Sequence, residues 1–416
     1  MPVNGFLVDN VVQKYNYESL ENYNTPDFST SSTYQVGDYV MYQGKLYKCT
    51  TAITTGGAWD STKWSLAILS DDVADLKSIF SNVWNAVTDG NCDNTGAADC
   101  TSIVQAAINN ATDGTMLFFP KGTYLFEGGI TITGKKGITI KGEGAGYYGT
   151  MFEVTYAYSF MTFYGGERIT VCDLSVKGPD TQNSRCFYIY DNTPATLDCR
   201  FTYSRFFNLG IDRFYTGISI DAPCGYNFFN NVRIHTMANY SQACGFAIGL
   251  QYRNTVVDPS IRPNYIYLTE CQVDGLSHNT ACHGVRIATC QYVWIDKCDF
   301  CNLNGNGVFV NNNVASSVCE DIYITNTSLY NNNVGVYLNQ SANGIQRISL
   351  IGNTIVTALG QYHYVLQAVK ADDSLDPIRN VTVCANMFRD YSTTQRNFFA
   401  DSKIDSATYY KVGVGI

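Results

Sequence analysis

The chain has 416 residues, of which 45% are hydrophobic, 14% aromatic and only 15% charged, and its net charge at pH 7 is −9. It contains no cluster of Lys and Arg that could neutralise phosphates, which argues against nucleic acid as a partner, whereas neutral or cationic glycans remain compatible with the charge. No apolar run reaches membrane-spanning length, so no membrane segment is expected.

The first 69 residues predict an arm and a small module. Residues 1–28 are polar, rich in Asn and Tyr and without periodicity, which is typical of an extended arm. They hold no basic segment followed by an apolar core, so a Sec-type export signal is not expected. Residues 29–69 alternate aromatic and polar residues around a Gln43-Gly44 turn, which predicts a compact β module.

A short helical neck is predicted over residues 70–90. Its apolar residues recur at alternating spacings of three and four, as on the a/d stripe of a coiled coil: Val73, Leu76, Phe80, Val83 and Val87. Ser70, Asp71 and Asp72 suit the start of a helix. The stripe is shorter than three heptads, so two interpretations stay open, a helix that caps the next domain or a neck through which three chains associate.

A repeat within residues 91–395 predicts the fold. Five copies, spaced 26 to 33 residues apart, align at Ile266, Val293, Ile322, Ile348 and Val381. Apolar residues recur two and seven positions further on, and an earlier copy has Ile169, Val171, Leu174 and Val176. Each copy holds two short strands, which bury their apolar face only when copies stack. The sequence therefore predicts an all-β solenoid, a parallel β-helix, with the helical pattern of residues 100–111 covering its first edge and a separate C-terminal segment at 396–416.

The run DCTSIVQAAINNATDGTMLFFPKGTYLFEGGITITGKKGITIKGEG, residues 99–144, resembles the opening of the pectate-lyase-like superfamily. The resemblance extends over about residues 84–390 and implies a right-handed, single-stranded parallel β-helix. It leaves the activity open, because that superfamily includes lyases, hydrolases, epimerases and non-catalytic adhesins. Lys297 follows VWID where a pectate lyase has His, and no R-x-P-x-x-R motif or calcium-binding carboxylate set is present, so pectate lyase activity and a cofactor are not expected.

The module at 33–68 is similar to small chitin-binding-type modules, through Tyr34, Gly37, Asp38, Tyr42, Gly44, Leu46, Tyr47, Trp59 and Trp64. An arm, such a module, a neck and a β-helix in this order resemble a bacteriophage tail spike. The resemblance implies a homotrimer that is assembled in the host bacterial cytoplasm, attaches to a phage tail or baseplate protein through its arm, and recognises bacterial surface polysaccharide. Two alternatives stay open: an extracellular β-helix hydrolase or lyase without a phage role, and a non-catalytic adhesin.

Two regions of the β-helix supply candidate catalytic residues. Glu270 and Asp299 are expected roughly 8 Å apart on the outer face, within the range of about 6.5–9.5 Å that inverting glycosidases use, and Asp296 lies beside them. Lys297 stacks over Glu270 in the alignment and is expected to pair with it, which would leave a solvated face without catalysis. Asp321 and Arg347 are expected to form a similar stacked pair.

Residues 185–260 match the repeat poorly and are rich in Tyr, Phe and Arg. Longer loops there could form a groove wall, with Asp212, Asp221 and Arg213 as catalytic or binding groups, or could pack against other chains of a trimer. In the N-terminal module Tyr42, Trp59 and Trp64 could stack on sugar rings, although one tryptophan is expected to form the core of so small a unit.

The 15 cysteines are an odd number in a large chain, which favours reduced thiols. The stretch YVWIDKCDFC suggests a C-x-x-C site, but the repeat places Cys298 inward and Cys301 outward. Cys298 is expected to stack on Cys271, at a separation where a disulfide is allowed and not required. His278, Cys282 and His283 are too close in sequence to converge on one zinc ion, so no metal site is expected.

Overall fold

The computed structural model describes residues 26–43, 45–66, 82–146, 148–190, 201–235, 240–249, 262–275, 281–312, 318–340, 344–357, 364–370, 378–389, 399–400, 404–405 and 408–410. The chain divides into two compact units, residues 1–81 and 82–416. Outside the described residues lie the predicted arm apart from residues 26–28, residues 67–69 of the predicted module and residues 70–81 of the predicted neck.

The first unit is a small antiparallel sheet. It has strands β1 (Tyr39–Tyr42), β2 (Lys45–Cys49) and β3 (Trp64–Leu66) in this order, with a 3-10 turn η2 (Ser61–Lys63) before β3. The predicted hairpin is confirmed, with Tyr42 opposite Lys45, and Gln43 adopts the left-handed conformation of a tight turn, φ 50°. Tyr34, Val40, Cys49 and Trp64 form its core.

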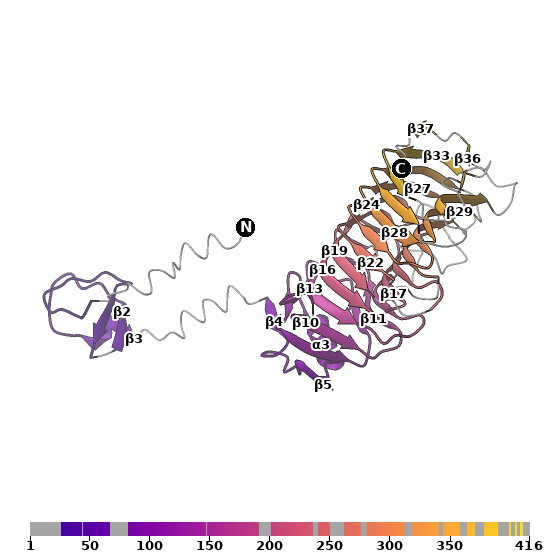
Figure 1. Ribbon diagram of the computed structural model, residues 1–416. Helices are drawn as coiled ribbons and strands as arrows, with labels where there is room; N and C mark the ends of the chain where they lie inside the picture. The colour runs from indigo at the N-terminus through magenta and orange to yellow at the C-terminus, as the bar shows by residue number, and fades with distance from the viewer. Residues whose placement is uncertain are drawn as a thin grey trace. The chain divides into compact units, whose positions relative to one another are not determined.

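The second unit is the predicted parallel β-helix (Figure 1). Its first sheet has 21 strands: β4 (Val83–Asn85), β5 (Thr95–Asp99), β6 (Met116–Phe119), β7 (Gly122–Phe126), β9 (Thr139–Gly142), β10 (Thr150–Val154), β13 (Thr170–Lys177), β16 (Arg205–Asp212), β19 (Asn227–His235), β21 (Asn264–Thr269), β22 (Gln272–Asp274), β24 (Gln291–Asp296), β25 (Asp299–Cys301), β27 (Cys319–Thr325), β28 (Ser328–Asn332), β30 (Ile345–Ile351), β31 (Thr354–Thr357), β33 (Ile378–Cys384), β34 (Met387–Arg389), β36 (Ile404–Asp405) and β37 (Thr408–Tyr410).

The second sheet has 10 strands: β8 (Ile130–Thr133), β11 (Ser159–Tyr164), β14 (Arg185–Tyr190), β17 (Thr216–Asp221), β20 (Cys244–Ile248), β23 (His283–Ile287), β26 (Asn306–Asn312), β29 (Val334–Gln340), β32 (Tyr364–Lys370) and β35 (Phe399–Ala400). A third, short sheet has β12 (Gly166–Glu167), β15 (Phe201–Thr202) and β18 (Cys224–Gly225). All pairings in this unit are parallel, and coils such as those of β21 and β22 or β24 and β25 contribute two strands to the first sheet.

The predicted register of the repeat is confirmed. Ile266 pairs with Val293, Val293 with Ile322, Ile322 with Ile348 and Ile348 with Val381. These residues point into the coil and are at most 2% exposed. Burial of such a column supplies the main stabilisation of a solenoid, because each coil buries its apolar side chains only against its neighbours.

Polar residues occupy the inward bend between the two strands of a coil. Asn353 Oδ1 accepts a hydrogen bond from the Thr327 backbone N–H at 2.9 Å, and Asn386 Oδ1 accepts one from the Asn353 N–H at 2.8 Å. At this bend the backbone N–H groups of Thr327 and Asn353 are not bonded by regular strand pairing. The stacked asparagine side chains supply the missing hydrogen bonds.

A helix α3 (Thr101–Asn110) covers the first edge of the second sheet, as predicted. It buries Val104 and Ile108, and the Gln105 side-chain amide exchanges two hydrogen bonds with the backbone of Thr131 on the terminal strand β8, at 2.7 and 2.9 Å. The outward backbone groups of Thr131 are therefore occupied, and the helix blocks pairing of another strand at this position.

Two predictions about this unit are wrong. The helical neck does not reach 83–90, because Val83–Asn85 form β4, which pairs with β6, and Trp84 packs edge-on against Phe119. Residues 185–260 do follow the repeat in their described parts, since Phe206 pairs with Phe229 and Phe229 with Leu268. Aromatic side chains replace aliphatic ones at these inward positions, which conceals the pattern in the sequence.

Candidate functional site

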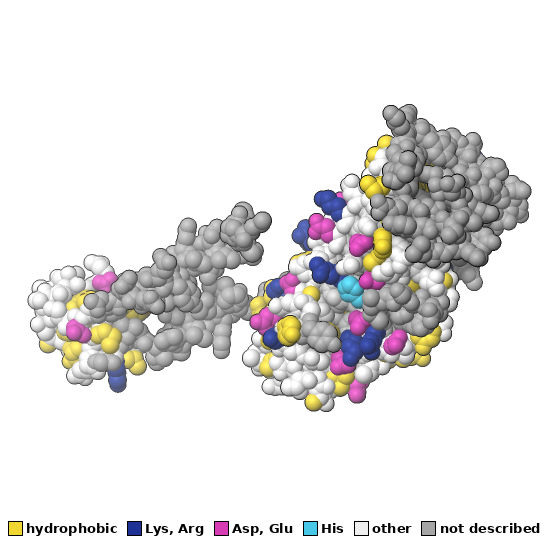
Figure 2. All heavy atoms as spheres, in the orientation of Figure 1, with side chains coloured by type: hydrophobic (Ala, Val, Ile, Leu, Met, Phe, Trp, Pro, Cys, Tyr) yellow, Lys and Arg dark blue, Asp and Glu magenta, His cyan; other side chains and the backbone are white. Residues whose placement is uncertain are grey.

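A groove lies on the outer face of the first sheet, over strands β10, β13, β16 and β19. It has a volume of about 850 Å³ and is lined by Thr123, Ala145, Gly146, Met151, Glu153, Asp173, Ser175, Val176, Lys177, Asn208, Leu209, Gly210, Ile211, Asp212, Arg213, Asn231, Arg233 and His235. Figure 2 shows acidic and basic side chains and a histidine side by side over the strands that Figure 1 labels β13, β16 and β19. Charged and amide side chains alternate with apolar and small residues on this surface.

The residues that line the groove follow from the alternation of inward and outward side chains along each strand. Leu209 and Ile211 point into the coil, so Gly210 and Asp212 between and after them point outward. Two outward columns result. One contains Ser175, Gly210 and Arg233, and the other contains Glu153, Lys177, Asp212 and His235.

Gly210 keeps the floor of the groove open. A Cβ atom at this position would lie 2.6 Å from Ser175 Oγ, so any side chain would displace a neighbour and fill the groove. Ser175 Oγ accepts a hydrogen bond from the Gly146 backbone N–H at 2.8 Å. This bond holds the segment after β9 as one wall of the groove.

Each carboxylate in the groove has a cation beside it. Glu153 lies 2.7 Å from Lys177 Nζ, Asp212 lies 3.7 Å from Arg213 Nε, and Asp173 forms an ion pair with Lys141. These cations offset the negative charges of the three carboxylates.

Asp173 begins a ladder of side-chain hydrogen bonds. Asn208 Nδ2 donates to Asp173 at 3.0 Å, and Asn231 Nδ2 donates to Asn208 Oδ1 at 2.9 Å. Burial alone would raise the pKa of Asp173, but the hydrogen bonds from Lys141 and Asn208 outweigh burial and lower the pKa. The ladder fixes which atom each amide presents to a ligand.

Of the residues predicted for this region, Asp212 and Arg213 line the groove and Asp221 does not. Asp221 ends β17 in the second sheet, is only 2% exposed and accepts a hydrogen bond from the Tyr188 hydroxyl at 3.2 Å. Sequence reasoning missed Glu153, Lys177, Arg233 and His235. Glu153, Lys177 and His235 share the outward column of Asp212, and Arg233 lies two residues before His235 on β19. This register is the signal that could have found them.

Glu270, Asp296 and Asp299 lie on the coils that follow the groove and are not among its lining residues. The predicted pairing of Glu270 with Lys297 is wrong, since the described part of the chain contains no ion pair between them. Glu270 has φ 56° in the bend between β21 and β22. The positive charge of Lys297 acts on Asp296 instead.

Asp296 and Asp299 have opposite environments. Burial would raise the pKa of Asp296, but hydrogen bonds from Thr325 Oγ1 at 2.7 Å and Asn326 Nδ2 at 2.9 Å lower it. Burial raises the pKa of Asp299, and the nearby carboxylate of Asp274 adds to this effect. Asp299 is thus the better proton donor of the two, and Asp296 serves to join two coils.

Eight aromatic side chains form a strip on the outer face of the same sheet. They make two stacked columns with centroid separations of 4.5–5.3 Å and ring angles of 4–14°: Tyr203, Tyr226, Tyr265 and Tyr292, and Phe228, Tyr267, Trp294 and Tyr323. The ring faces stack on one another, so mainly the ring edges point outward. Because a sugar stacks on a ring face, this strip is a poor platform for one.

In the N-terminal module the three candidate rings have different roles. Trp64 is 6% exposed and belongs to the core, so its assignment to sugar binding is wrong. Trp59 lies between Trp64, 5.1 Å away, and Tyr42, 3.9 Å away, with both rings nearly parallel to it. Tyr42 ends the stack and is half-buried, so its outer face is the one a sugar could reach.

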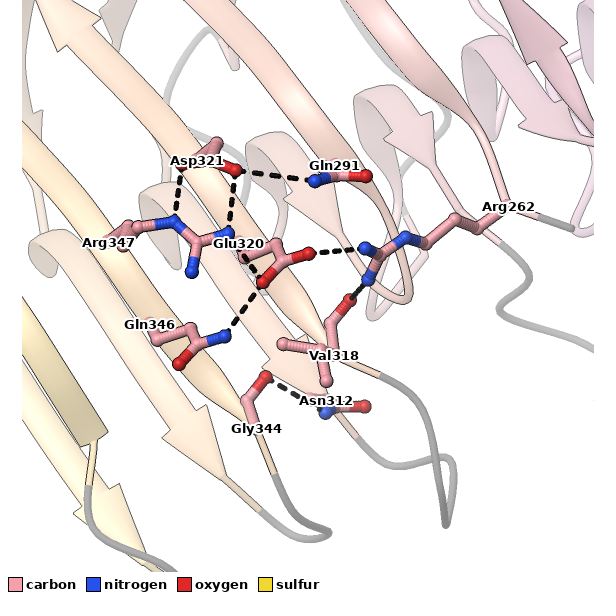
Figure 3. A network of polar contacts seen from close by, with 9 residues as sticks. All are labelled: Arg262, Gln291, Asn312, Val318, Glu320, Asp321, Gly344, Gln346 and Arg347. Carbon is pink, nitrogen blue, oxygen red and sulfur yellow. Dashed lines mark hydrogen bonds and ion pairs between the residues drawn. The ribbon is translucent and has the colours of Figure 1, made fainter. Parts of the chain in front are cut away.

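A network of charged side chains joins the coils around β24, β27 and β30 (Figure 3). Glu320 binds Arg262 on one side and Arg347 on the other, at 2.6 Å from Arg347, and accepts a hydrogen bond from Gln346 at 2.7 Å. The predicted Asp321–Arg347 pair is confirmed and is bidentate, at 2.6 and 2.8 Å. These groups satisfy one another, which is the arrangement of a structural cross-link.

The cysteines in the described residues are free thiols. Cys298 and Cys271 point inward and are at most 3% exposed, and Cys301 is 8% exposed, so the C-x-x-C pair forms no metal or redox site. Burial, with the charges of Asp299 and Asp274, raises the pKa of Cys301 to about 12.

No group of three metal-ligating side chains occurs in the described parts of the chain. His283 is buried, its Nδ1 accepts from the Asn306 N–H at 3.2 Å, and burial and Arg286 lower its pKa to about 3. A helix long and apolar enough to span a membrane is likewise not found among the described helices.

Comparison with known proteins identifies two segments. Residues 84–188 match the family described as rhamnogalacturonase A/epimerase, pectate lyase-like, and residues 27–64 match carbohydrate-binding module family 5/12. No curated protein matches the chain in sequence.

Several solved structures are similar to the chain at low identity. ORF18 of Geobacillus virus E2 is 15% identical with a TM-score of 0.42, over 91% of this chain and 74% of that chain. The A-module of the Azotobacter vinelandii mannuronan C-5 epimerase AlgE4 is 14% identical, TM-score 0.44, over 79% and 100%. The phiAB6 tailspike, solved with oligosaccharides of Acinetobacter baumannii surface polysaccharide, is 14% identical, TM-score 0.41, over 94% and 60%.

The two sequence matches agree with the resemblances seen in the sequence. The chain combines a small module that matches carbohydrate-binding module family 5/12 with a parallel β-helix whose first coils match a pectate-lyase-like family.

Proposed function

We propose that this protein is a bacteriophage tail-spike-type receptor-binding protein whose groove over β10, β13, β16 and β19 binds a bacterial surface polysaccharide. The observation that carries the proposal is the groove itself. It crosses four neighbouring strands, which span about 14 Å along the coil axis, and charged and amide groups line it. Such a surface suits a hydroxylated polymer that runs along the axis better than a compact apolar ligand.

Two further features support a carbohydrate ligand. The N-terminal module matches a carbohydrate-binding family, and Tyr42 offers a ring face there. A virion location and attachment to a phage tail or baseplate protein through residues 1–28 remain part of the proposal. They depend on the order of arm, module, neck and β-helix.

The second candidate is a hydrolase or lyase without a phage role, and the carboxylates of the groove favour it. Glu153 and Asp212 belong to one outward column, two coils apart, which separates their backbones by about 9.6 Å. This is close to the upper end of the spacing of roughly 6.5–9.5 Å between acid and base in inverting glycosidases. New reducing ends or double bonds after incubation with a polysaccharide would reveal cleavage, and Glu153→Gln and Asp212→Asn should abolish it.

Two substitutions in one outward column test the groove. Gly210→Leu fills the floor, so we expect the affinity for a bound surface polysaccharide to fall about tenfold or more, which corresponds to about 1.4 kcal/mol. Thr354→Leu, at the equivalent outward position five coils further on, is the matched control and should leave binding unchanged. Affinity is measured by calorimetry, and thermal unfolding confirms that both variants fold. Equal binding by both variants would place the ligand elsewhere.

The proposed protein is a homotrimer, because a spike attached to a symmetric tail requires association of its chains. Sedimentation equilibrium of the full chain should give three times its mass of 46.1 kDa. A stable monomer at micromolar concentration would contradict the spike proposal and leave the enzyme alternative in place.

A further inference from the structure

We propose, building on the function proposed above, that the groove selects an anionic saccharide and that Arg233 is the residue that recognises the negative group. The net charge of −9 for the whole chain would favour neutral or cationic glycans. The charges within the groove give the opposite preference.

One cationic side chain in the groove, that of Arg233, has no carboxylate partner among the described residues. Its three carboxylates, those of Glu153, Asp173 and Asp212, are matched by Lys177, Lys141 and Arg213. Arg233 lines the same groove and is solvent-exposed, and the described part of the chain offers it no ion pair or hydrogen bond. A ligand can therefore bind Arg233 without breaking an existing contact.

The surroundings of Arg233 leave room for such a ligand. Its neighbours in the outward column are Gly210 on one side and Gln272 on the other, so no acid lies directly beside it. Gly210 has no side chain, and this leaves open the floor next to the guanidinium. His235, two residues along β19, lies between Asp212 and Asp274 in the other column, beside two acids rather than beside Arg233's open floor.

The chemistry of arginine defines the ligand class. Its planar guanidinium presents five N–H donors in a fixed fork that matches the two oxygens of a carboxylate or of a phosphate. A hydroxyl group gains much less from this geometry. The ligand is thus a sugar that carries a carboxylate or a phosphate group.

An array of purified bacterial surface polysaccharides, containing uronate-bearing, phosphate-bearing and neutral members, tests the inference with the full chain. We expect the tightest ligands to be acidic. The best ligand is then compared with its carboxyl-reduced or dephosphorylated form, which identifies the negative group, and its affinity should fall about tenfold or more when that group is removed.

Arg233→Gln should lower the affinity for the acidic ligand by a similar factor. It should lower the affinity for the carboxyl-reduced or dephosphorylated ligand little further. Arg205→Gln is the matched control, because Arg205 is an exposed arginine on the same sheet outside the groove, and its affinity should equal that of the native protein. Tight binding of neutral polysaccharides with no effect of Arg233→Gln would overturn this inference and leave the groove as a glycan site. Failure to bind any member of the array would overturn the proposed function itself.

Discussion

Tyr42, Trp59 and Trp64 lie in one stack, yet only the outermost ring is available to a ligand. Trp64 is buried against Tyr34, with ring centroids 5.1 Å apart, and Trp59 has a ring on each side. The buried Trp64 holds Trp59 in place, and Trp59 in turn holds Tyr42. Because the ring of Tyr42 is already oriented, it loses little conformational entropy when a sugar binds.

Substitutions at the two ends of this stack should separate folding from binding. Tyr42→Ala is expected to abolish glycan binding by the module with little loss of stability, whereas Trp64→Ala should cost about 3–5 kcal/mol because it empties the core. Tryptophan fluorescence during glycan titration and during urea unfolding gives both quantities. If Tyr42→Ala bound glycan as well as the native module, the stacking role of this ring would be wrong.

Single residues also show where sequence reasoning stopped. Asp212 and Arg213 were predicted because they lie in a segment rich in Arg and aromatic residues. Arg233 lies in the same segment and was not singled out, and Glu153 lies outside it. They become part of one site only through the register of β10, β13, β16 and β19. Equivalent positions in these coils are 23 to 35 residues apart, and no local pattern encodes such unequal lengths.

At the level of single elements, the ion-pair network of Arg262, Glu320, Asp321 and Arg347 contributes a pH-dependent part of the stability. The hydrogen bond from Arg347 lowers the pKa of Asp321, and for Glu320 the contacts with Gln346, Arg262 and Arg347 outweigh burial and lower its pKa as well. A pKa that is lower in the folded state stabilises the fold fully above the unfolded value of about 4. That stabilisation disappears as the pH falls through the folded value.

The substitution Arg347→Gln tests this contribution. We expect it to reduce the free energy of unfolding at pH 7 by about 1–2 kcal/mol, since Arg347 is 42% exposed and water screens part of its charge. Between pH 6 and pH 3 the variant should lose less stability than the native protein. Arg168→Gln, which removes a largely exposed pair with Glu167, serves as the control and should change neither quantity. Parallel pH profiles for the native protein and Arg347→Gln would refute the role of the network.

Elements of the fold differed in how well the sequence predicted them. The strands that contain Val293, Ile322 and Ile348 were predicted in register, because alternating apolar residues recur there with nearly constant spacing. The ten-stranded second sheet was not predicted as part of the repeat, since the segments between the sheets differ in length from coil to coil. Strand β4 was taken for a helix because Val83 and Val87 continue a heptad spacing, while pairing with β6 determines the real conformation.

At the scale of the whole molecule, the β-helix provides a rigid support on which outward side chains of successive coils form columns. A polymer that runs along the axis meets one such column after another, so a small number of substitutions can change its specificity without affecting the inward core. This separation explains why the fold was predictable from apolar residues such as Ile266. The ligand depends instead on outward residues such as Arg233.

The proposed binding site is tested most directly by a crystal structure of the full chain with an oligosaccharide from the polysaccharide it binds. We expect sugar density in the groove over β10, β13, β16 and β19, close to Gly210 and with a negative group at Arg233. Density confined to another surface, such as the aromatic strip around Trp294 or the coils of Glu270 and Asp299, with an empty groove, would contradict it.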